Sequence, residues 1–487
     1  MMKRMFALLL ALVMVLGLVA CGNKAETPAP EQKEETTAPA PAPEKAPEAA
    51  PEAAPEAAEP EKVTLRWIGA GWSQNDKANK IIEKWNAIHP EIEVQYIELG
   101  TSVDEDYLKN LDTMISGGEV VDVTYLTYAD VYKRVIYGGA LPLDEYIAAA
   151  GDDYEAMYGT LSTALLKYED AIYGVPYAGN TFKVFYNKTM TDAAGITIPE
   201  TWSIEEFTAA AQALNDPANG VWGCVFPYTW DQICYTSAEI SGWQPAIKDE
   251  AGNVVPNFDD ETFKTALQWC YDLSMTHDVA PDLATMKSES INRRQALALG
   301  KTAMIIDGPY TLVWLQNYMF NDPGEGPLPF ELGVANIPYT TDAGKDVSYN
   351  TVAGAFYVPK SAAHPAEAYE FAKFVCNECP MESANYMPIY TGADMVAATT
   401  SFTEYTDANG ELHTEVYPQD VAIAAVATPG ESHIGRFNYD PAMATYTSLM
   451  TTLFTDQYAL YMNGEMELQD WVDMMQMLGE AEIAAAN

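Results

Sequence analysis

The stretch of residues 172–202 constrains the fold of this 487-residue chain more than any other. It begins with an apolar run, punctuated by a glycine and a proline, which predicts a strand that leaves one structural unit. Residues 181–186 then alternate as a second, buried strand does, and the chain turns. Ser203, with Glu206 three residues later, is the signature of a capping box that starts a helix. Strand, turn and helix in this order predict an α/β protein.

The part of the chain from residue 63 to 487 is too long for one ordinary hydrophobic core, and its length predicts two lobes. It opens with a strand at residues 63–68, a helix with an apolar stripe over 78–88, and a strand at 94–99. Together they predict a β-α-β unit with a right-handed crossover. A third strand is predicted at residues 122–126. Loops after such strands lie at the carboxyl edge of an open α/β sheet, where ligands bind.

The N-terminal residues have the pattern of an export signal. Two basic residues precede an apolar run over residues 5–20, which is too short to span a bilayer comfortably. The run ends in Leu-Val-Ala before Cys21 and is similar to the bacterial lipobox; a chance cysteine after an ordinary signal is the alternative. Residues 1–20 are therefore the predicted signal peptide. Residues 21–62 are predicted to be a lipidated cysteine and a disordered Pro/Ala/Glu-rich linker, because they contain too few apolar residues to order themselves.

The charge balance disfavours whole classes of partner. The chain has 26 basic and 70 acidic side chains and a formal net charge of −44, of which −40 lies after residue 62. A field of that sign disfavours nucleic acid and anionic membrane headgroups. It also disfavours phosphorylated ligands, unless a local basic pocket overrides it. A cationic solute is the ligand that the charge alone favours, and a solvated acidic surface is the interpretation without a ligand.

The cysteines do not predict a disulfide scaffold, since five of them follow Cys21 at irregular spacings. Cys376 and Cys379 have the spacing of a redox or zinc half-site, but no second pair stands at a matching distance. They also follow a helical pattern, and not the strand that precedes a thioredoxin-like motif. We therefore expect packing at a helix end or a local disulfide, and neither a metal nor a cofactor.

Four motifs follow one another along the chain. They are Tyr-Gly-Val-Pro at 173–176, Tyr-Asn-Lys at 186–188, Pro-x-Thr-Trp at 199–202, and Gly-Lys-Thr-Ala-Met followed by Gly-Pro-Tyr within 300–310. In this order they resemble the carbohydrate-type extracellular solute-binding proteins of ABC importers, the maltose-binding-protein-like group. The last motif is the most specific match, and the resemblance covers residues 63–478.

The resemblance implies an α/β, two-lobed, periplasmic-binding-protein-like fold (type II) with three hinge crossings. The crossings are expected near residues 174–177, 303–307 and 337–350. The first lobe is then expected to contain residues 63–175 plus 304–340, and the second 176–303 plus 350–487.

The same resemblance implies a set of side chains that contact the ligand. Aromatic faces stack on the C–H patches of a pyranose, and polar groups bind its hydroxyls. The expected ligand-binding residues are Trp72, Tyr128, Asp130, Tyr177, Asn180, Tyr228, Trp230, Asp231, Trp243, Asp307, Tyr310 and Tyr446. Packing within a lobe is the alternative for the aromatic residues, and helix capping is the alternative for Asp130. Arg293 and Arg294 are expected on the surface.

The implied function is that of the extracellular solute-binding component of an ABC transporter. It would capture a carbohydrate, expected to be an oligosaccharide, by closing two lobes around it, and would deliver it to the transmembrane permease subunits. We expect a monomer without enzymatic activity, lipid-anchored on the extracellular face of the cell membrane, with no nucleic-acid partner.

Two other functions stay open at this point. One is a binder of a polyamine or another cationic solute, motivated by the negative charge and by Asp130, Asp231 and Asp307. The other is a secreted glycosidase, because composition alone does not exclude a catalytic pair of carboxylates.

We expect Cys21→Ser to release the protein from membranes or to leave its signal uncleaved, because the lipid has no other predicted attachment point. Ligand affinity should not change, since the linker separates Cys21 from the folded part. Membrane fractionation and mass determination of the variant test this. A variant that stays membrane-bound with its signal removed would contradict the expectation.

Overall fold

The computed structural model describes residues 62–71, 76–226, 233–321, 323–379, 387–427, 431–434 and 443–486. All of them belong to one compact unit, residues 60–487. The predicted signal peptide, Cys21 and the linker up to residue 61 lie outside the described residues. Within the described ranges, no helix has both the length and the apolar character needed to cross a membrane.

The first sheet combines the early strands of the chain with later ones. Its described strands, in spatial order, are β14 (Met387–Pro388), β6 (Val175–Thr181), β13 (Val347–Tyr357), β3 (Val123–Leu126), β1 (Val63–Ala70) and β2 (Ile92–Gly100), with β17 (Glu431–Ile434) also paired to β13. β1 is parallel to β2 and β3, as a β-α-β unit requires. β13 is antiparallel to β3 and β6 and closes the sheet between them.

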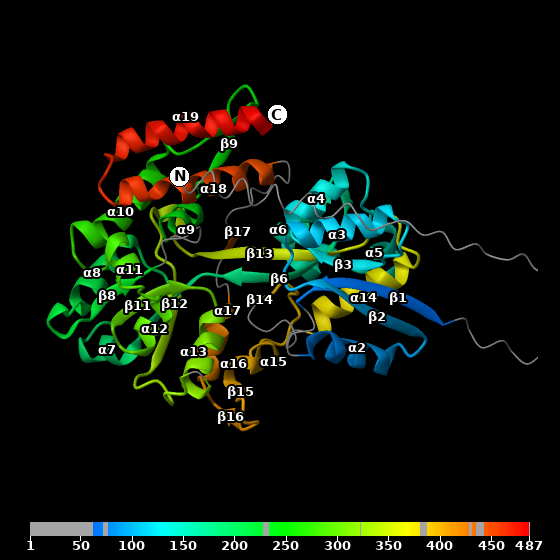
Figure 1. Cartoon of the computed structure of the whole chain (residues 1–487), viewed down its shortest axis with the longest axis horizontal. Coiled ribbons are helices and arrows are strands. Elements are labelled where there is room, and N and C mark those ends of the chain that lie inside the picture. Colours follow the sequence, from blue (N-terminus) through cyan, green and yellow to red (C-terminus); the bar gives the residue numbers. More distant parts are fainter. Residues whose placement is uncertain are drawn as a thin grey trace, which may run out of the picture. The chain divides into compact units, whose positions relative to one another are not determined.

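Helices cover both faces of the first sheet (Figure 1). They are α2 (Lys77–Ile88), α3 (Glu105–Ser116), α4 (Tyr128–Ile136), α5 (Asp144–Ala150), α6 (Tyr154–Leu166) and α14 (Pro365–Glu378). α2 and α14 pack together, and α4 packs with α6. The short strands β4 (Lys167–Tyr168) and β5 (Ala171–Ile172) form a ribbon just before β6.

The second sheet has four strands among the described residues. Their order is β12 (Leu332–Asn336), β7 (Lys183–Asn187), β11 (Thr302–Asp307) and β8 (Trp222–Val225). β7 is antiparallel to both β12 and β11, while β11 and β8 are parallel. One face carries Val184 and Ile306 in a separate apolar core, and the other carries Phe185 and Ile305, which join the core of the first sheet.

The helices around the second sheet come from distant parts of the chain. They are α7 (Lys188–Ala193), α8 (Ile204–Leu214), α9 (Ile233–Ile240), α10 (Glu261–Met275), α11 (Leu283–Ser288), α12 (Arg293–Ala298), α13 (Tyr310–Phe320), α17 (Gln419–Val426), α18 (Ala444–Met462) and α19 (Leu468–Ala486). The remaining elements are the hairpins β9 (Ala246–Lys248) with β10 (Val254–Pro256) and β15 (Glu404–Thr406) with β16 (Leu412–Thr414), the short helices α15 (Met395–Ala398) and α16 (Thr400–Thr403), and the 3-10 turns Pro217–Asn219 and Asp342–Gly344.

The chain changes sheets within one strand-to-strand step. β6 ends at Thr181 in the first sheet and β7 begins at Lys183 in the second, so only Phe182 separates them. The sequence predicts this crossing near residues 174–177, but β6 stays paired with β13 over its whole length. Figure 1 shows β6 and β13 side by side.

The strand pairing corrects one expected crossing. A return to the first lobe is expected near residues 303–307, and residues 304–340 are assigned to that lobe. However, β11 pairs with β7 and β8, and β12 pairs with β7, so both strands belong to the second sheet. Every residue of β11 is buried, and such a strand needs a hydrogen-bonded neighbour on each side. Correspondingly, β13 and α14 pack in the first core, although residues 350–487 are assigned to the second lobe.

Local signals are confirmed where they depend on neighbouring residues alone. The capping box of α8 is present, with Ser203 and Glu206 bonding to each other's backbone amides. From their sequence, residues 402–417, around Asp-Ala-Asn-Gly at 407–410, are expected to form a β-hairpin insertion, and β15 and β16 form it. These features fix the ends of elements, whereas strand pairing decides which sheet each element joins.

Gly354 of β13 lies where no side chain fits, and we expect Gly354→Ala to destabilise the fold. A Cβ at this position would lie 2.2 Å from the backbone oxygen of Leu126 in β3. Overpacking of this kind costs roughly 1–3 kcal/mol in the free energy of unfolding. Gly100→Ala is the matched control, because its Cβ would meet an ordinary contact at 3.6 Å. Urea unfolding of both variants tests this, and equal effects would contradict the expected difference.

Candidate ligand-binding site

Three polar residues lie in one row at an edge of the second sheet. Lys183 of β7 pairs with Asp307 of β11 on one side and with Asn336 of β12 on the other. Paired positions point to the same face of a sheet, so the three side chains share a face. The chain enters this edge directly from β6 of the first sheet. The edge therefore adjoins the first sheet and is the natural position for a ligand held between the two.

Asp307 is a fully buried carboxylate held by two arginines of α12. Arg293 Nε and Nη2 donate to its oxygens at 2.9 Å each, and Arg294 donates at 2.6 Å and 3.2 Å. Its Oδ1 also accepts from the amide of Gly308. Burial by itself would raise the pKa of Asp307, but the charges and hydrogen bonds of the two arginines outweigh it and hold the pKa below its usual value. The predicted surface position of Arg293 and Arg294 is wrong, since each side chain is only about a fifth exposed.

Tyr310 begins α13, three residues after Asp307. The guanidinium carbon of Arg294 lies 4.8 Å from the centre of the Tyr310 ring and covers one of its faces. A Cβ on Gly308 would lie 2.4 Å from the same ring, so glycine is required there. Tyr310 is half-buried. The guanidinium of Arg294 therefore occupies one face of this ring.

Lys183 is an unusually buried lysine, with 3% of its surface exposed. Among the described residues, its Nζ has one hydrogen-bond acceptor, Asn336 Oδ1 at 2.6 Å. The Asn336 backbone oxygen in turn accepts from Trp202 Nε1 at 2.7 Å. Burial lowers the pKa of Lys183 to about 8, with the charge of Glu200 acting in the opposite direction. Burying a cation beside one neutral partner carries a desolvation cost, which an additional hydrogen-bond acceptor would reduce.

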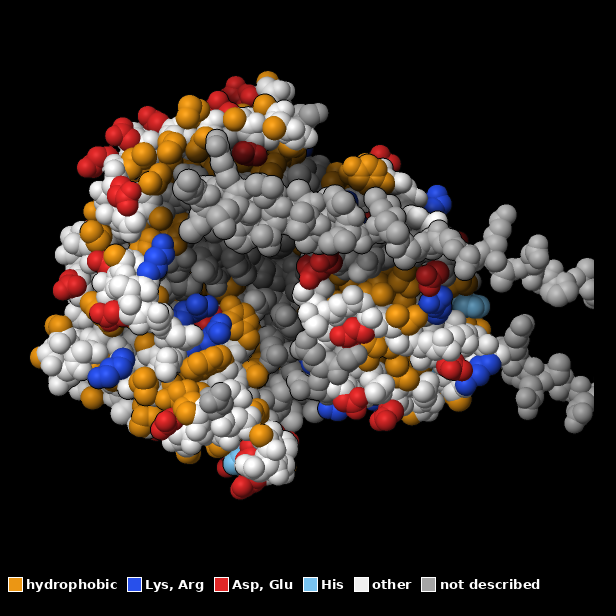
Figure 2. Space-filling view, in the orientation of Figure 1, with side chains coloured by type: hydrophobic (Ala, Val, Ile, Leu, Met, Phe, Trp, Pro, Cys, Tyr) orange, Lys and Arg blue, Asp and Glu red, His pale blue; other side chains and the backbone are white. Residues whose placement is uncertain are grey.

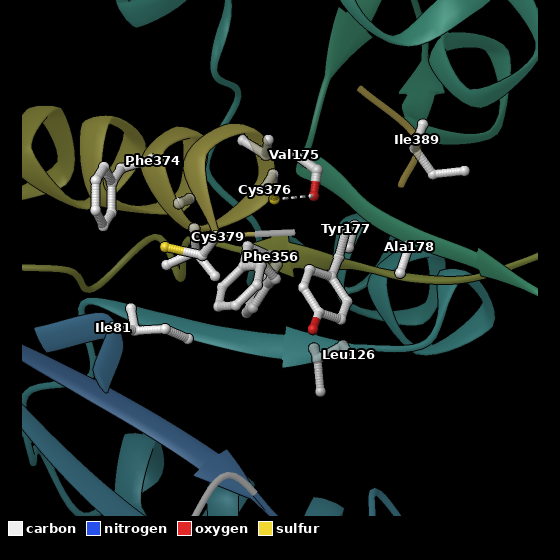
Figure 3. Close-up of a cluster of buried hydrophobic side chains, with 14 of the residues drawn as sticks. Ile81, Leu126, Val175, Tyr177, Ala178, Phe356, Phe374, Cys376, Cys379 and Ile389 are labelled. Carbon is white, nitrogen blue, oxygen red and sulfur yellow. Dashed lines mark hydrogen bonds between the residues drawn. The ribbon is translucent and has the colours of Figure 1, made fainter. Parts of the chain in front are cut away.

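Three expected ligand contacts lie in the apolar cores. Tyr177 is buried beside Tyr125 and Phe356, and Figure 3 shows its ring among side chains of the first core. Trp243 is buried, stacks on Phe263 and donates to the Asn257 backbone oxygen at 2.7 Å. Tyr128 is 3% exposed, and burial raises its pKa well above the usual value. For all three, packing within a lobe is the alternative that the structure favours.

The remaining expected contacts divide into two groups. Asp130 is 7% exposed, and its carboxylate accepts a hydrogen bond from Thr127 Oγ1 at 2.6 Å. Thr127 is the N-cap residue of α4. Asn180 pairs with Thr351 within the first sheet, and Tyr446 is half-buried against the second core. Outside the described residues lie Trp72, Tyr228, Trp230 and Asp231. In the sequence the last three follow β8, whose carboxyl end lies beside that of β11.

Cysteines and metal-ligating groups lie away from this edge. Cys376 and Cys379 are buried free thiols at the end of α14, and Cys376 Sγ contacts the Val175 backbone oxygen at 3.9 Å (Figure 3). Packing at a helix end is thus confirmed for them. Among the described residues, one group could bring metal ligands within 4.8 Å of one another, namely Asp407, Glu411 and His413 at the β15–β16 turn. The backbone amides of Asn409 and Glu411 already donate hydrogen bonds to Asp407 Oδ1.

Sequence reasoning missed four residues of the row and its surroundings, namely Lys183, Asn336, Arg293 and Arg294. Lys183 is a charged residue inside an otherwise apolar strand, and this pattern indicates a buried charge that needs a partner. Asn336 ends the strand of residues 332–336, and Arg293–Arg294 directly precede the most specific motif. A buried carboxylate such as Asp307 needs cationic partners, and this double arginine was the nearest candidate in the sequence.

We expect Lys183→Met to change how stability depends on pH. The folded pKa of about 8 lies below that of an unfolded lysine, so between pH 8 and about 10.4 the unfolded chain binds more protons. Wild-type stability should therefore rise over this window relative to the variant, by up to roughly 3 kcal/mol, and the full penalty should remain below pH 8. Denaturant unfolding at several pH values measures the difference. The exposed Lys360→Met is the control, and parallel curves for wild type and Lys183→Met would contradict the expectation.

Comparisons with solved structures show the fold. A sugar transporter from Rhizobium etli in an open conformation matches with a TM-score of 0.69 and 19% identity, covering 86% of this chain and 99% of that one. A substrate-binding protein from Listeria monocytogenes in complex with cycloalternan matches with a TM-score of 0.62 and 18% identity, covering 87% and 99%. The maltose-bound protein MalE3 of T. maritima gives 0.58 and 17%, covering 86% and 99%.

Sequence comparisons add relatives of known description. A maltotriose-binding protein from Pyrococcus abyssi is 22% identical over 252 residues, which is 51% of this chain and 49% of that protein. An uncharacterised lipoprotein from Streptomyces antibioticus is 29% identical over 170 residues, 34% of this chain and 36% of that protein. The chain thus spans about half and a third of these two relatives. The family model described as bacterial extracellular solute-binding protein matches residues 71–378, more than half of the chain. The chain therefore belongs to the family of bacterial extracellular solute-binding proteins, and it has the two-lobed, type II α/β fold of the solved structures above.

Proposed function

We propose that this protein captures a carbohydrate, specifically an oligosaccharide, between its two lobes and delivers it to an ABC permease. The observation that carries the proposal is the position of Tyr310. Its ring stands at the start of α13, beside the edge where the chain passes from the first sheet into the second. Aromatic rings stack on the C–H patches of pyranoses, and the contact with Arg294 helps to hold the Tyr310 ring in place.

The ligands of similar proteins support the chemistry. Cycloalternan and maltose are bound in two of the structural neighbours, and maltotriose is named for one relative. All three ligands are oligosaccharides. Hydroxyl-rich ligands of this kind need planar donors as well as an aromatic face, and Asn336 and the arginines of α12 supply such groups near Tyr310.

Hinge closure is the mechanism that we propose for capture. The backbone around Phe182 and the segment between β12 and β13 each join a strand of one sheet to a strand of the other, so both must take up part of any rotation between the lobes. A ligand that touches both lobes then binds the closed state more tightly and increases its population. The closed form would dock on the permease, with the lipid on Cys21 keeping the protein at the membrane.

The structure gives no support to the cationic-solute alternative. Two of its three carboxylates already have partners. Asp307 is bonded to two arginines, and the Asp130 carboxylate accepts a hydrogen bond from the N-cap Thr127 and lies 3.6 Å from Lys133 Nζ. Asp231 lies outside the described residues. The glycosidase alternative is not favoured either, because the family and the structural neighbours are solute-binding proteins.

We expect Tyr310→Ala to weaken oligosaccharide binding by roughly ten- to a hundredfold, or about 1–3 kcal/mol, through loss of the stacking area. A thermal-shift screen of neutral mono- and oligosaccharides first identifies a ligand, and calorimetric titration then measures the affinity. Tyr310→Phe is the matched control, because it keeps the ring and the contact with Arg294.

The melting temperatures of both Tyr310 variants should change little, since the residue is only half-buried. Unchanged affinity in Tyr310→Ala, together with a large fall in melting temperature, would make Tyr310 a core residue. If no saccharide in the screen raises the melting temperature of the wild-type protein, the proposed function itself fails.

A further inference from the structure

We propose that the β15–β16 hairpin binds a divalent transition-metal ion of the Zn²⁺ type through Asp407, Glu411 and His413. This inference does not rest on the proposed function, because the hairpin lies away from the row of Lys183 and its partners. The observations that carry it are the strand register, the spacing of the donor atoms, and a contact that holds His413 from outside the hairpin.

The register of the hairpin places the three side chains together. Tyr405 of β15 pairs with His413 of β16, and the Asp407 amide donates to the Glu411 backbone oxygen at 3.0 Å. Side chains two residues apart on an extended chain point to the same side, so Asp407 and Glu411 lie on the side that carries His413. One donor atom from each of the three lies within 4.8 Å of the other two.

The spacing of two of these atoms suits a shared metal ion. Asp407 Oδ2 lies 3.5 Å from His413 Nε2. That separation is longer than the roughly 2.7–3.2 Å of an N–H···O hydrogen bond. Two ligand atoms on one tetrahedral Zn²⁺, each bonded at about 2.1 Å, are about 3.4 Å apart. A zinc ion bonded to both atoms therefore requires little change in their separation.

Asp407 divides its two oxygens between the turn and this site. Oδ1 accepts from the amides of Asn409 and Glu411 at 2.9 Å each, while Oδ2 faces His413. Hydrogen bonds of this kind orient the carboxylates that bind metals. The Asp407 side chain is 7% exposed, whereas Glu411 is exposed. The site thus has a buried inner side and an open outer side, through which an ion and its water ligands can enter.

His413 is held in place by the end of α13, a different element. Its imidazole stacks on Phe320, with the ring centres 4.0 Å apart and the planes 14° from parallel. The next residue, Asn321, accepts from the Ala408 amide at 2.8 Å and donates to the Tyr405 hydroxyl. These contacts fix both the imidazole and the turn before an ion arrives, which lowers the ordering cost of binding.

Closure of the turn explains only part of this arrangement. An aspartate that closes a turn needs one carboxylate oxygen and the amides that follow it, and Asp407 Oδ1 fulfils that role. The turn requires neither a stacked imidazole nor the Glu411 carboxylate beside Oδ2. The convergence of three donor groups from outside this turn closure is what a metal ion explains.

The chemistry of the donors selects the class of ion. One imidazole and two carboxylates suit zinc and similar divalent metals, whereas Ca²⁺ and Mg²⁺ prefer ligand sets made of oxygen alone. The formal net charge of −44 also attracts cations to the protein surface. In Figure 2 a histidine and acidic side chains lie together on the surface at the lower edge of the molecule, where Figure 1 places β15 and β16.

The test uses Zn²⁺ and the full chain, purified in detergent without a histidine tag. The protein is treated with EDTA, the chelator is removed, and ZnCl₂ is titrated by calorimetry. We expect Zn²⁺ to bind and to raise the melting temperature, since an ion that prefers the folded hairpin stabilises the folded state. Ca²⁺ and Mg²⁺ in place of Zn²⁺ should bind at least ten times more weakly, because the imidazole adds little to their binding.

Variants connect the ion to these side chains. His413→Gln and Glu411→Gln should each weaken Zn²⁺ binding at least tenfold and reduce the rise in melting temperature. Glu411→Gln should not change the melting temperature of the metal-free protein, because Glu411 is exposed, so the test stands even if His413→Gln does not fold. His277→Gln is the matched control, since it removes an exposed histidine that belongs to no such group among the described residues.

Three results would overturn the inference. Wild-type protein that shows neither heat of binding nor a rise in melting temperature with Zn²⁺ would refute the site. Unchanged Zn²⁺ binding in folded Glu411→Gln and His413→Gln would show that zinc is held elsewhere. Ca²⁺ or Mg²⁺ that binds as tightly as Zn²⁺ would refute the class of ion. Saccharide binding is measured separately in EDTA, so its failure would concern the proposed function alone.

Discussion

The structure depends on one constraint, which is that β6 and β7 are consecutive strands in two different sheets. β6 must pair with β13 and β7 with β11 and β12, and one buried residue, Phe182, lies between them. This connection fixes which edge of the second sheet adjoins the first. It also explains why the polar row of Lys183, Asp307 and Asn336 is found at that edge, where apolar packing would otherwise be expected.

The buried ionic cluster at Asp307 joins the fold to the site. Its hydrogen bonds hold α12 against the end of β11 and orient Gly308, so the start of α13 is fixed by the same carboxylate. Such clusters seldom add net stability, because desolvation offsets the attraction between the charges. The proposed function gives this cluster a role at the end of the second sheet where the chain crosses between the lobes.

Much of the local structure could be predicted from the sequence, since it depends on neighbours in the chain. The capping box of α8, the first β-α-β unit and the β15–β16 hairpin are examples. The sheet that β11 joins could not be predicted from the sequence, because strand pairing depends on residues that are far apart in the chain. Nor could the aromatic residues be sorted, since a core tryptophan such as Trp243 and a half-buried tyrosine such as Tyr310 both present apolar ring faces. Only the packing around each ring distinguishes them.

The close approach of Gly308 to the Tyr310 ring has a consequence for the energetics of recognition. With Arg294 over one face and backbone against its edge, the ring has little rotational freedom before any ligand arrives. An aromatic side chain that must be ordered on binding loses about 0.5–1.5 kcal/mol of affinity. Here that ordering is complete when the protein folds. Under the proposed function the ring is therefore preorganised, and Gly308 would contribute to how tightly the ligand is held without touching it.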